Sequence, residues 1–325
     1  MVLDTRSMSE VSAVIVSWNS AAEIEGCISA ALTAGVAEIL VVDNGSTDQT
    51  REIVRKLPQV KLLHFPENLG FAGGVNRGVE AAQFDSVLIL NPDCFVMSGL
   101  ESMARAAQGG AAGGMLVHPD GKLQAGFAVR SFPTATILAL EVLGINRLWP
   151  TNPSNQHYRC SSFNPAMAQE VDQPPGAFLM LNRPIFMNLG GMDEAFWPVW
   201  FEDVDYCLRL RQAGYKIAYC PEAKATHKGA ASIEKILWTF RELAWYASLL
   251  RYATKHFGWL SRRLVGLAVA AASVLRAFTG IFFRRQGLKA LDVYAGVFRL
   301  AWVSLVHDRV EHSRPAGRWE GAKHL

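Results

Sequence analysis

An alternation of short apolar runs with helix-patterned stretches is the feature of this sequence that most constrains its fold. The apolar runs have strand length and are rich in β-branched residues. They cover residues 11–18, 37–43, 60–65 and 86–91, and the stretches 21–34, 47–57 and 72–82 between them have helical spacing. Nearly continuous apolar strands that alternate with helices are typical of an α/β unit whose parallel sheet is buried on both faces.

Polar residues follow these strands directly. In an open parallel sheet, ligands bind outside the carboxyl ends of the strands, so we examined the residues that stand there. In "DNGSTD", Ser46 to Asp48 are explained as a turn and a helix cap, but Asp43 ends the strand and could accept a hydrogen bond from a ligand. Pro92 forces the chain to turn and presents Asp93, which is either a turn aspartate or a ligand for a hard divalent cation.

The glycine-rich stretch "ENLGFAGGVNRG" (67–78) does not have the dinucleotide-binding pattern. A GxGxxG after the first strand is missing, which argues against a nicotinamide enzyme. Glycines at the start of a helix can leave backbone N–H groups open to an anion such as a diphosphate. They can equally allow the helix to pack closely, and the sequence leaves both interpretations open.

The stretch "FEDVDYCLRLRQAGY" predicts a helix over residues 202–213 that ends before Gly214. Asp205 and Arg209 are four residues apart, which predicts an ion pair on the helix surface. Glu202 and Asp203 fall in the first turn, where the helix dipole favours negative charge. They are therefore either ordinary helix-terminal acids or carboxylates used in chemistry.

Composition limits the class of protein. The 325 residues carry a net charge of +3, which is too small to indicate nucleic-acid binding. Five scattered cysteines without a CxxC pair indicate reduced thiols rather than a disulfide framework or a zinc module. The first ten residues lack the apolar segment of a signal peptide, so we expect the chain to stay in the cytoplasm.

Taken in order, these motifs resemble the family-2 glycosyltransferases, in particular their bacterial rhamnosyltransferase-like branch. The resemblance rests on "VIVSWN", "VVDNGSTD", "NLGFAGGVNRG", "LNPD", "GAFLMLNR" and "GGMDEAFWPVWFEDVDYCLRLRQAGYKI", followed by His227. It extends over about two thirds of the chain, from Val11 to Ser232. It implies a GT-A fold, in which one α/β domain joins a nucleotide-binding half to an acceptor-binding half.

The resemblance also implies roles for individual residues. Asp203 would be the catalytic base, because a carboxylate near apolar side chains has raised basicity, and Glu202 would position the acceptor or support Asp203. Asp93 matches the last position of the family's DxD metal motif and His227 matches a further metal ligand in related enzymes. The first DxD position is Asn91 here, so a single carboxylate remains and Mg²⁺ versus Mn²⁺ is left open. The nucleotide would be bound by Ser17, Trp18, Asp43, Asn44, Asn68 and Gly73, and the donor or acceptor sugar would lie near Gly176 and Trp200.

The last third of the chain has a different pattern, because proline almost vanishes after residue 230. Residues 233–257 have the period of an amphipathic helix with basic residues on its polar side. The apolar stretch 264–283 is long enough to span a bilayer, but Arg276 near its middle would cost about 2.5–3.5 kcal/mol there. We expect a helix that lies on or dips into the cytoplasmic leaflet. A buried helical subdomain, a dimer interface and a full span are the alternatives.

The expected organisation is therefore a GT-A glycosyltransferase domain over residues 1–232 and a helical region over residues 233–325. The expected activity is inverting, metal-dependent transfer of a sugar, by resemblance L-rhamnose from dTDP-L-rhamnose, to a polyprenyl-diphosphate-linked or growing glycan. We expect the protein on the cytoplasmic face of the plasma membrane, without a nucleic-acid partner, and leave homo-oligomers open. The alternatives are a nucleotidyltransferase, which would need a basic phosphate clamp near Asp93, and a catalytically idle membrane-bound scaffold or regulatory subunit of a glycan assembly complex.

Overall fold

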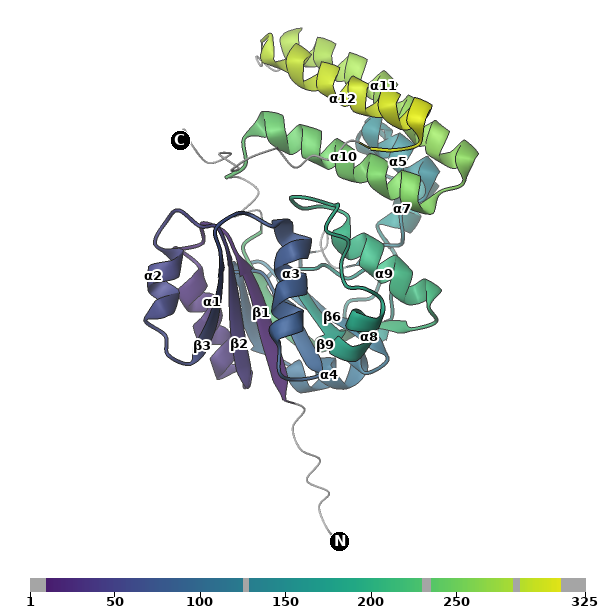
Figure 1. The fold of residues 1–325 in the computed structure, drawn as a ribbon. Helices are drawn as coiled ribbons and strands as arrows, with labels where there is room; N and C mark the ends of the chain where they lie inside the picture. Colours follow the sequence, from purple (N-terminus) through teal and green to yellow (C-terminus); the bar gives the residue numbers. More distant parts are fainter. Residues whose placement is uncertain (1–9, 125–128, 230–234, 283–286, 311–325) are drawn as a thin grey trace.

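A computed structural model describes residues 10–124, 129–229, 235–282 and 287–310 (Figure 1). The four predicted strands are present and lie parallel in the order β3-β2-β1-β4. Because their carboxyl ends share one edge of the sheet, the polar residues that follow them are brought together there. The bounds are β1 Val11–Ser17, β2 Glu38–Asn44, β3 Val60–Phe65 and β4 Ser86–Leu90.

The second half of the sheet is mixed rather than parallel. β8 lies antiparallel to both β4 and β6, β9 lies parallel to β6, and β5 and β7 lie antiparallel to β9. This arrangement joins the second half of the domain to the first through the β4–β8 pair. The bounds are β5 Cys94–Ser98, β6 Gly110–Val117, β7 Gln169–Glu170, β8 Phe178–Asn182 and β9 Lys216–His227.

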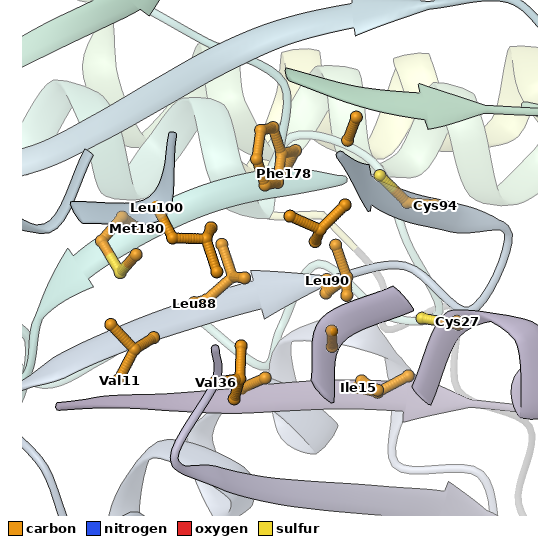
Figure 2. Close-up of a cluster of buried hydrophobic side chains, with 14 of the residues drawn as sticks. Val11, Ile15, Cys27, Val36, Leu88, Leu90, Cys94, Leu100, Phe178 and Met180 are labelled. Carbon is orange, nitrogen blue, oxygen red and sulfur yellow. The ribbon is translucent and has the colours of Figure 1, made fainter. Parts of the chain in front are cut away.

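Helices cover both faces of this sheet, as the apolar strands predict. Successive residues of β1 alternate between two clusters: Ile15 packs on the side of α1, α2 and α4, and Val16 on the side of α3, α8 and α9. Figure 2 shows the first of these clusters, where Phe178 of β8 lies near Leu90 of β4. The helices are α1 Ile24–Thr33, α2 Thr50–Arg55, α3 Gly70–Ala81, α4 Leu100–Ala107, α8 Arg183–Asn188 and α9 Glu202–Gln212.

The glycines of α3 pack against the sheet. A Cβ on Gly74 would lie 2.6 Å from Val16 Cγ1, and one on Gly78 would lie 2.2 Å from Val14 Cγ1. Distances of this kind leave no room for a side chain. Close packing of helix on strand, one of the two interpretations left open above, therefore explains these two glycines.

We expect Gly78→Ala to destabilise the fold by about 1–3 kcal/mol, because the added methyl group would overlap a valine of β1. Urea unfolding followed by circular dichroism measures this loss. Gly258→Ala is the matched control, since a Cβ there meets no atom within 4 Å. Equal stability of the two variants would contradict close packing at Gly78.

A layer of long helices lies across the carboxyl-end edge of the sheet (Figure 1). α10 lies above the strands, α11 and α12 lie farther out, and α5 packs against α11. Residues of α5 share one buried cluster with residues of all three long helices. The bounds are α5 Ala135–Val142, α6 Ile145–Leu148, α7 Pro153–Tyr158, α10 Trp238–His256, α11 Trp259–Phe282 and α12 Lys289–His307.

The structure adds to the expectations for the C-terminal third. α10 and α11 correspond to the two predicted helices, whereas α12 was not predicted. Arg276 is turned toward the protein, with Nη2 3.3 Å from the carbonyl oxygen of Val142. The expected boundary at 232/233 lies outside the described residues, as does Phe283, and the cluster around α5 connects the two regions that the boundary separates.

Candidate active site

A cavity of about 510 Å³ lies where the strand ends meet the helical layer. Its size suits a small-molecule ligand. It is lined from the sheet side by strand ends and from the opposite side by α5, α10 and the first turn of α9. Nine of the twelve predicted site residues line it: Ser17, Trp18, Asn44, Asn68, Gly176, Trp200, Glu202, Asp203 and His227.

Asn44 and Asp43 stand at the end of β2. The side chain of Asn44 donates to the carbonyl of Gly70 (2.9 Å) and accepts from the N–H of Leu69 (3.1 Å), so it fastens the start of α3 to the strand. Oδ2 of Asp43 contacts His64 Nδ1 at 2.9 Å. The second oxygen, Oδ1, is buried and has no hydrogen-bond partner among the described residues. A buried acceptor without a donor is costly, so this oxygen suits a ligand N–H.

Asp93 and His227 are neighbours because β5 and β9 pair. Cys94, at the start of β5, lies opposite His227, at the end of β9. His227 Nε2 is consequently 3.5 Å from Asp93 Oδ1, and both side chains are buried. Burial alone would raise the pKa of Asp93, but the hydrogen bond and charge of His227 outweigh it and hold the pKa below its usual value.

Gln124 fixes the orientation of His227 and was not predicted. Its Nε2 donates to the carbonyl of His227, so its Oε1 is the end that faces His227 Nδ1, at 3.0 Å. Nδ1 therefore carries a proton. Nε2 donates to Asp93 when the ring is charged, and in the neutral ring its lone pair is free to bind a cation. Metal-ligating histidines usually donate their other ring N–H to a fixed acceptor, and Gln124 Oε1 is such an acceptor here. A single glutamine has no sequence signal that would have identified it.

The donor set at this point fits a divalent cation that is completed by its substrate. Among the described residues, no group of three or more His, Cys, Asp or Glu side chains is arranged to hold a metal. Asp93 Oδ1 and His227 Nε2 offer two ligands. Mg²⁺ in particular is commonly held by one or two protein carboxylates together with substrate phosphates. These two residues could thus hold a metal whose remaining ligands come from a diphosphate.

Glu202 and Asp203 begin α9 after two consecutive residues, Trp200 and Phe201, with left-handed backbones (φ 88° and 71°). Left-handed non-glycine residues are unfavourable and cluster at functional sites. Glu202 is buried, and burial next to Asp203 raises its pKa well above the usual value. Burial also raises the pKa of Asp203, whose Oδ2 accepts a hydrogen bond from the N–H of Gly176 at 3.2 Å. Neither carboxylate is an ordinary exposed helix-terminal acid.

The aromatic residues before α9 have different environments. Trp197 is buried, donates to the carbonyl of Asn68 (3.0 Å) and packs edge-on against Phe240. Trp200 lines the cavity instead. Trp197 is thus part of the core, and Trp200 is the tryptophan of this loop that a sugar could reach.

Three predicted site residues do not line the cavity as the structure describes it. Asp43 and Asp93 are buried at its edge, each next to a residue that does line it. Gly73 is buried in the first turn of α3, where a Cβ would be 2.9 Å from Leu69 Cβ and 3.6 Å from Glu194 Oε2. The role of Gly73 stays a prediction without support from its position.

The predicted ion pair of Asp205 with Arg209 is present, but the prediction of a surface position was wrong. Asp205 is fully buried, and its carboxylate contacts Arg209 Nε at 2.9 Å. It also contacts Lys255 Nζ and His256 Nε2, both at 2.7 Å. Because these two residues belong to α10, Asp205 joins the helix that carries Glu202 to the helical layer.

The comparison with protein families identifies the domain. Residues 12–171 match the family described as Glycosyl transferase family 2. The chain is 29% identical to N-acetylglucosaminyl-diphospho-decaprenol L-rhamnosyltransferase of Mycobacterium tuberculosis over 238 residues. The aligned region covers 68% of this chain and 76% of that protein. Over 203 residues it is 25% identical to the O-antigen chain rhamnosyltransferase WbaN of Salmonella anatum, covering 59% and 56% of the two chains.

Solved structures share the fold at low sequence identity. GalNAc-T7 with UDP, GalNAc and Mn²⁺ superposes with a TM-score of 0.57 and 13% identity, over 93% of this chain and 57% of that one. The mannosyltransferase PcManGT from Pyrobaculum calidifontis, with GDP-Man and Mn²⁺, superposes with a TM-score of 0.50 and 16% identity, over 92% and 88%. The predicted GT-A fold is thereby confirmed. With its mixed α/β sheet and its match over residues 12–171, the chain belongs to glycosyl transferase family 2.

Proposed function

We propose that this protein is a metal-dependent, inverting glycosyltransferase that moves L-rhamnose from dTDP-L-rhamnose to a lipid-linked or growing cell-surface glycan. The observation that carries the proposal is that His227, Asp203 and Trp200 line one cavity at the carboxyl ends of the strands. A site for a leaving diphosphate, a basic carboxylate and an aromatic face for a sugar are the parts that such a transfer requires. The rhamnosyltransferase names of two relatives support the choice of sugar.

The nucleotide would bind at the ends of β1 and β2. The orphaned Oδ1 of Asp43 suits the N3–H of a thymine or uracil base. Trp18, beside it at the end of β1, offers an aromatic face, and Asn68 lies at the turn into α3. A buried acceptor at this point favours a base with a ring N–H, such as thymine or uracil, over adenine, whose N1 carries no proton.

In the transfer, Asp203 would accept the proton of an acceptor hydroxyl. The oxygen of that hydroxyl then forms a bond to the anomeric carbon while the bond from that carbon to the diphosphate oxygen breaks, with inversion. A divalent metal bound by Asp93 and His227 would act as a Lewis acid that stabilises the charge of the leaving diphosphate. Glu202, whose pKa is raised well above its usual value by burial, would support Asp203.

The helical layer offers a surface for membrane docking. α11 and α12 are long and apolar enough to cross a membrane by length and composition. Their outer side exposes large apolar residues, while Arg276 faces inward. We infer peripheral docking on the cytoplasmic face of the plasma membrane, because lipid-linked acceptors are presented there. The exposed residues, here called the apolar face, are Leu260, Leu264, Leu267, Val274, Leu275, Phe278, Leu291, Phe298, Trp302 and Val306.

Release of nucleoside diphosphate tests the proposed reaction. The purified protein would be given dTDP-, UDP- and GDP-sugars with a bacterial lipid extract, with Mg²⁺ or Mn²⁺ and again with EDTA. We expect release from dTDP-L-rhamnose that requires both lipid and metal. Release from a different donor would correct the sugar, and binding of nucleotide without any release would favour the idle scaffold or regulatory subunit.

The metal assignment has a separate prediction. Asp93→Ala should weaken dTDP binding by at least tenfold in Mg²⁺ or Mn²⁺ and hardly change it in EDTA, because a charged ligand is removed. Isothermal titration calorimetry measures both conditions, and Asp120→Ala on an exposed turn is the control. An equal loss with and without metal would show that Asp93 supports the fold rather than a cation.

A further inference from the structure

Two arginines line the end of the cavity that faces α5. Arg130 pairs through its backbone with Gln173, and its guanidinium lies over the ring of Tyr158, 5.5 Å from the centroid. Arg159 is the next residue after Tyr158 and lines the same wall. The two arginines bring two positive charges to this wall, against one negative charge from Glu141. This wall of the cavity therefore suits an anion.

Arg159 is held in place by a chain of buried amides. Its Nε donates to Asn155 Oδ1 at 3.0 Å, and the N–H of Asn155 donates to Asn152 Oδ1 at 2.9 Å. Asn152 Nδ2 donates to Asn146 Oδ1, and Asn146 Nδ2 donates to Glu141 Oε2 at 2.8 Å. The three asparagines are buried, but the Arg159 side chain is 44% exposed, and its Nη2 is 3.8 Å from Glu141. The network thus presents a guanidinium whose outer edge can still bind a ligand, and such a fork suits phosphate oxygens.

The position of Arg130 relates this wall to the catalytic carboxylate. Arg130 pairs with Gln173, and Gly176, three residues farther along that segment, donates to Asp203 Oδ2 at 3.2 Å, so Arg130 and Asp203 line the same part of the cavity. A ligand with an anionic group on the two arginines would place the unit bonded to that group beside Asp203. If the ligand is a sugar diphosphate, that unit is the sugar attached directly to the diphosphate.

Apolar side chains continue the wall beyond the arginines. Ile137 and Leu138 of α5 line the cavity, and α5 packs against α11, whose outer side belongs to the apolar face. Leu148 and Trp149, at the end of α6, are 86% and 57% exposed in the same segment that holds Arg159. Two arginines next to apolar side chains match the charge and the apolar chain of a prenyl diphosphate.

We propose that Arg159 and Arg130 bind the diphosphate of a prenyl-linked acceptor, with the sugar next to that diphosphate at Asp203 and the prenyl chain directed along α5 to the apolar face. The proposal rests on the proposed function and names the residues that hold its acceptor. It assigns the donor diphosphate to the metal at Asp93 and His227 and the acceptor diphosphate to Arg159 and Arg130.

Binding of farnesyl diphosphate tests this site without any turnover. Calorimetry in EDTA keeps the metal-dependent donor site from contributing, and farnesol is the uncharged comparison. We expect wild type to bind farnesyl diphosphate at least tenfold more tightly than farnesol, and Arg159→Gln to lose that difference. Arg159→Lys, which keeps the charge but loses the fork, should bind with intermediate affinity. Arg147→Gln, an exposed arginine of α6 outside the cavity lining, should bind like wild type.

The outcomes separate clearly. Equal binding of farnesyl diphosphate and farnesol, or equal losses in Arg159→Gln and Arg147→Gln, would overturn the proposal. A melting curve like that of wild type would show that Arg159→Gln is folded. If Arg159→Gln does not fold, the affinities of Arg159→Lys and wild type for farnesyl diphosphate and farnesol are compared instead, and equal affinities would overturn the proposal.

A second experiment compares acceptors during transfer. The same sugar would be supplied on farnesyl diphosphate and on a neutral octyl glycoside, with dTDP-L-rhamnose as donor. We expect Arg159→Gln to raise KM at least tenfold for the diphosphate acceptor and to leave KM for the glycoside unchanged. An equal effect on both acceptors would overturn the inference. No transfer by wild type to either acceptor would refute the proposed function, while the binding experiment would still judge the anion site.

Discussion

Asp203→Asn should lower kcat by about 10²–10⁴-fold while the affinity for dTDP stays that of wild type. Asparagine has the size of aspartate and can still accept the hydrogen bond from Gly176, but it cannot take the proton of an acceptor hydroxyl. Steady-state assays of nucleoside diphosphate release and calorimetry with dTDP measure the two quantities. Asp120→Asn, on an exposed turn, is the control for the loss of one negative charge. Turnover within tenfold of wild type would rule out Asp203 as the base.

The pH profile of wild type gives a second test of the same residue. Burial raises the pKa of Asp203 above its ordinary value of 3.8, and a base works in its deprotonated form. kcat/KM should therefore increase with pH, with the midpoint of its acid limb above 3.8. The residual activity of Asp203→Asn should lack this limb. An unchanged limb in the variant would assign it to another group.

Asp205→Asn should reduce the free energy of unfolding by about 3–5 kcal/mol at neutral pH, the second large effect that we expect. The substitution leaves Arg209, Lys255 and His256 around a neutral group in a buried position. Urea unfolding followed by circular dichroism measures the loss. Asp193→Asn removes a carboxylate that is 29% exposed and contacts the same Lys255, so about 1 kcal/mol or less is expected there. An equal loss of unfolding free energy in the two variants would show that the buried ion pairs of Asp205 stabilise the fold no more than the exposed pair of Asp193.

The stability contributed by Asp205 depends on pH with a definite sign. Burial alone would raise its pKa, but the hydrogen bonds from His256 and Lys255 and the charge of Arg209 lower it. As the pH falls, the unfolded chain therefore takes up the proton first. The contribution should be complete above the ordinary aspartate pKa of about 3.9 and be lost as the pH falls below it. Asp205→Asn should lack this part of the acid dependence.

The cluster around Asp205 matters for the site as well as for stability. α9 carries Glu202 and Asp203 in its first turn, and α10 contributes Trp245 to the cavity wall. Asp205 holds these two helices together through Lys255 and His256. We infer that the shape of the cavity between sheet and helical layer depends on this buried contact.

Local patterns in the sequence were enough for the elements and for the neighbourhood of the site. The apolar, β-branched runs predicted the four parallel strands, and the order of elements placed Ser17, Asn44 and Asp93 at one edge of the sheet. Such predictions succeed because strand ends of a parallel sheet must share an edge, whatever the rest of the chain does. α12 was not predicted, although Ala290, Val297 and Ala301 have helical spacing on its buried side.

Other properties depended on residues that are far away in the chain. Trp197 and Trp200 have the same local surroundings in sequence, yet one packs against Phe240 and the other lines the cavity. Asp205 was expected on a surface because its partner Arg209 is close in the chain. It is buried, and it also contacts His256, which is 51 residues away in the sequence. The amide of Gln124 faces His227 across 103 residues. Contacts between residues so far apart in the chain leave no periodic pattern in the sequence from which they could be predicted.

By itself, the sequence determined the strand and helix order, the edge at which the polar residues gather and the family. The tertiary structure alone decided which carboxylates are buried, which tryptophan meets the cavity, which tautomer His227 takes and where Arg159 is held. The reason is physical: strand and helix periods are set by neighbours along the chain, whereas burial and hydrogen-bond partners are set by elements that meet only after folding.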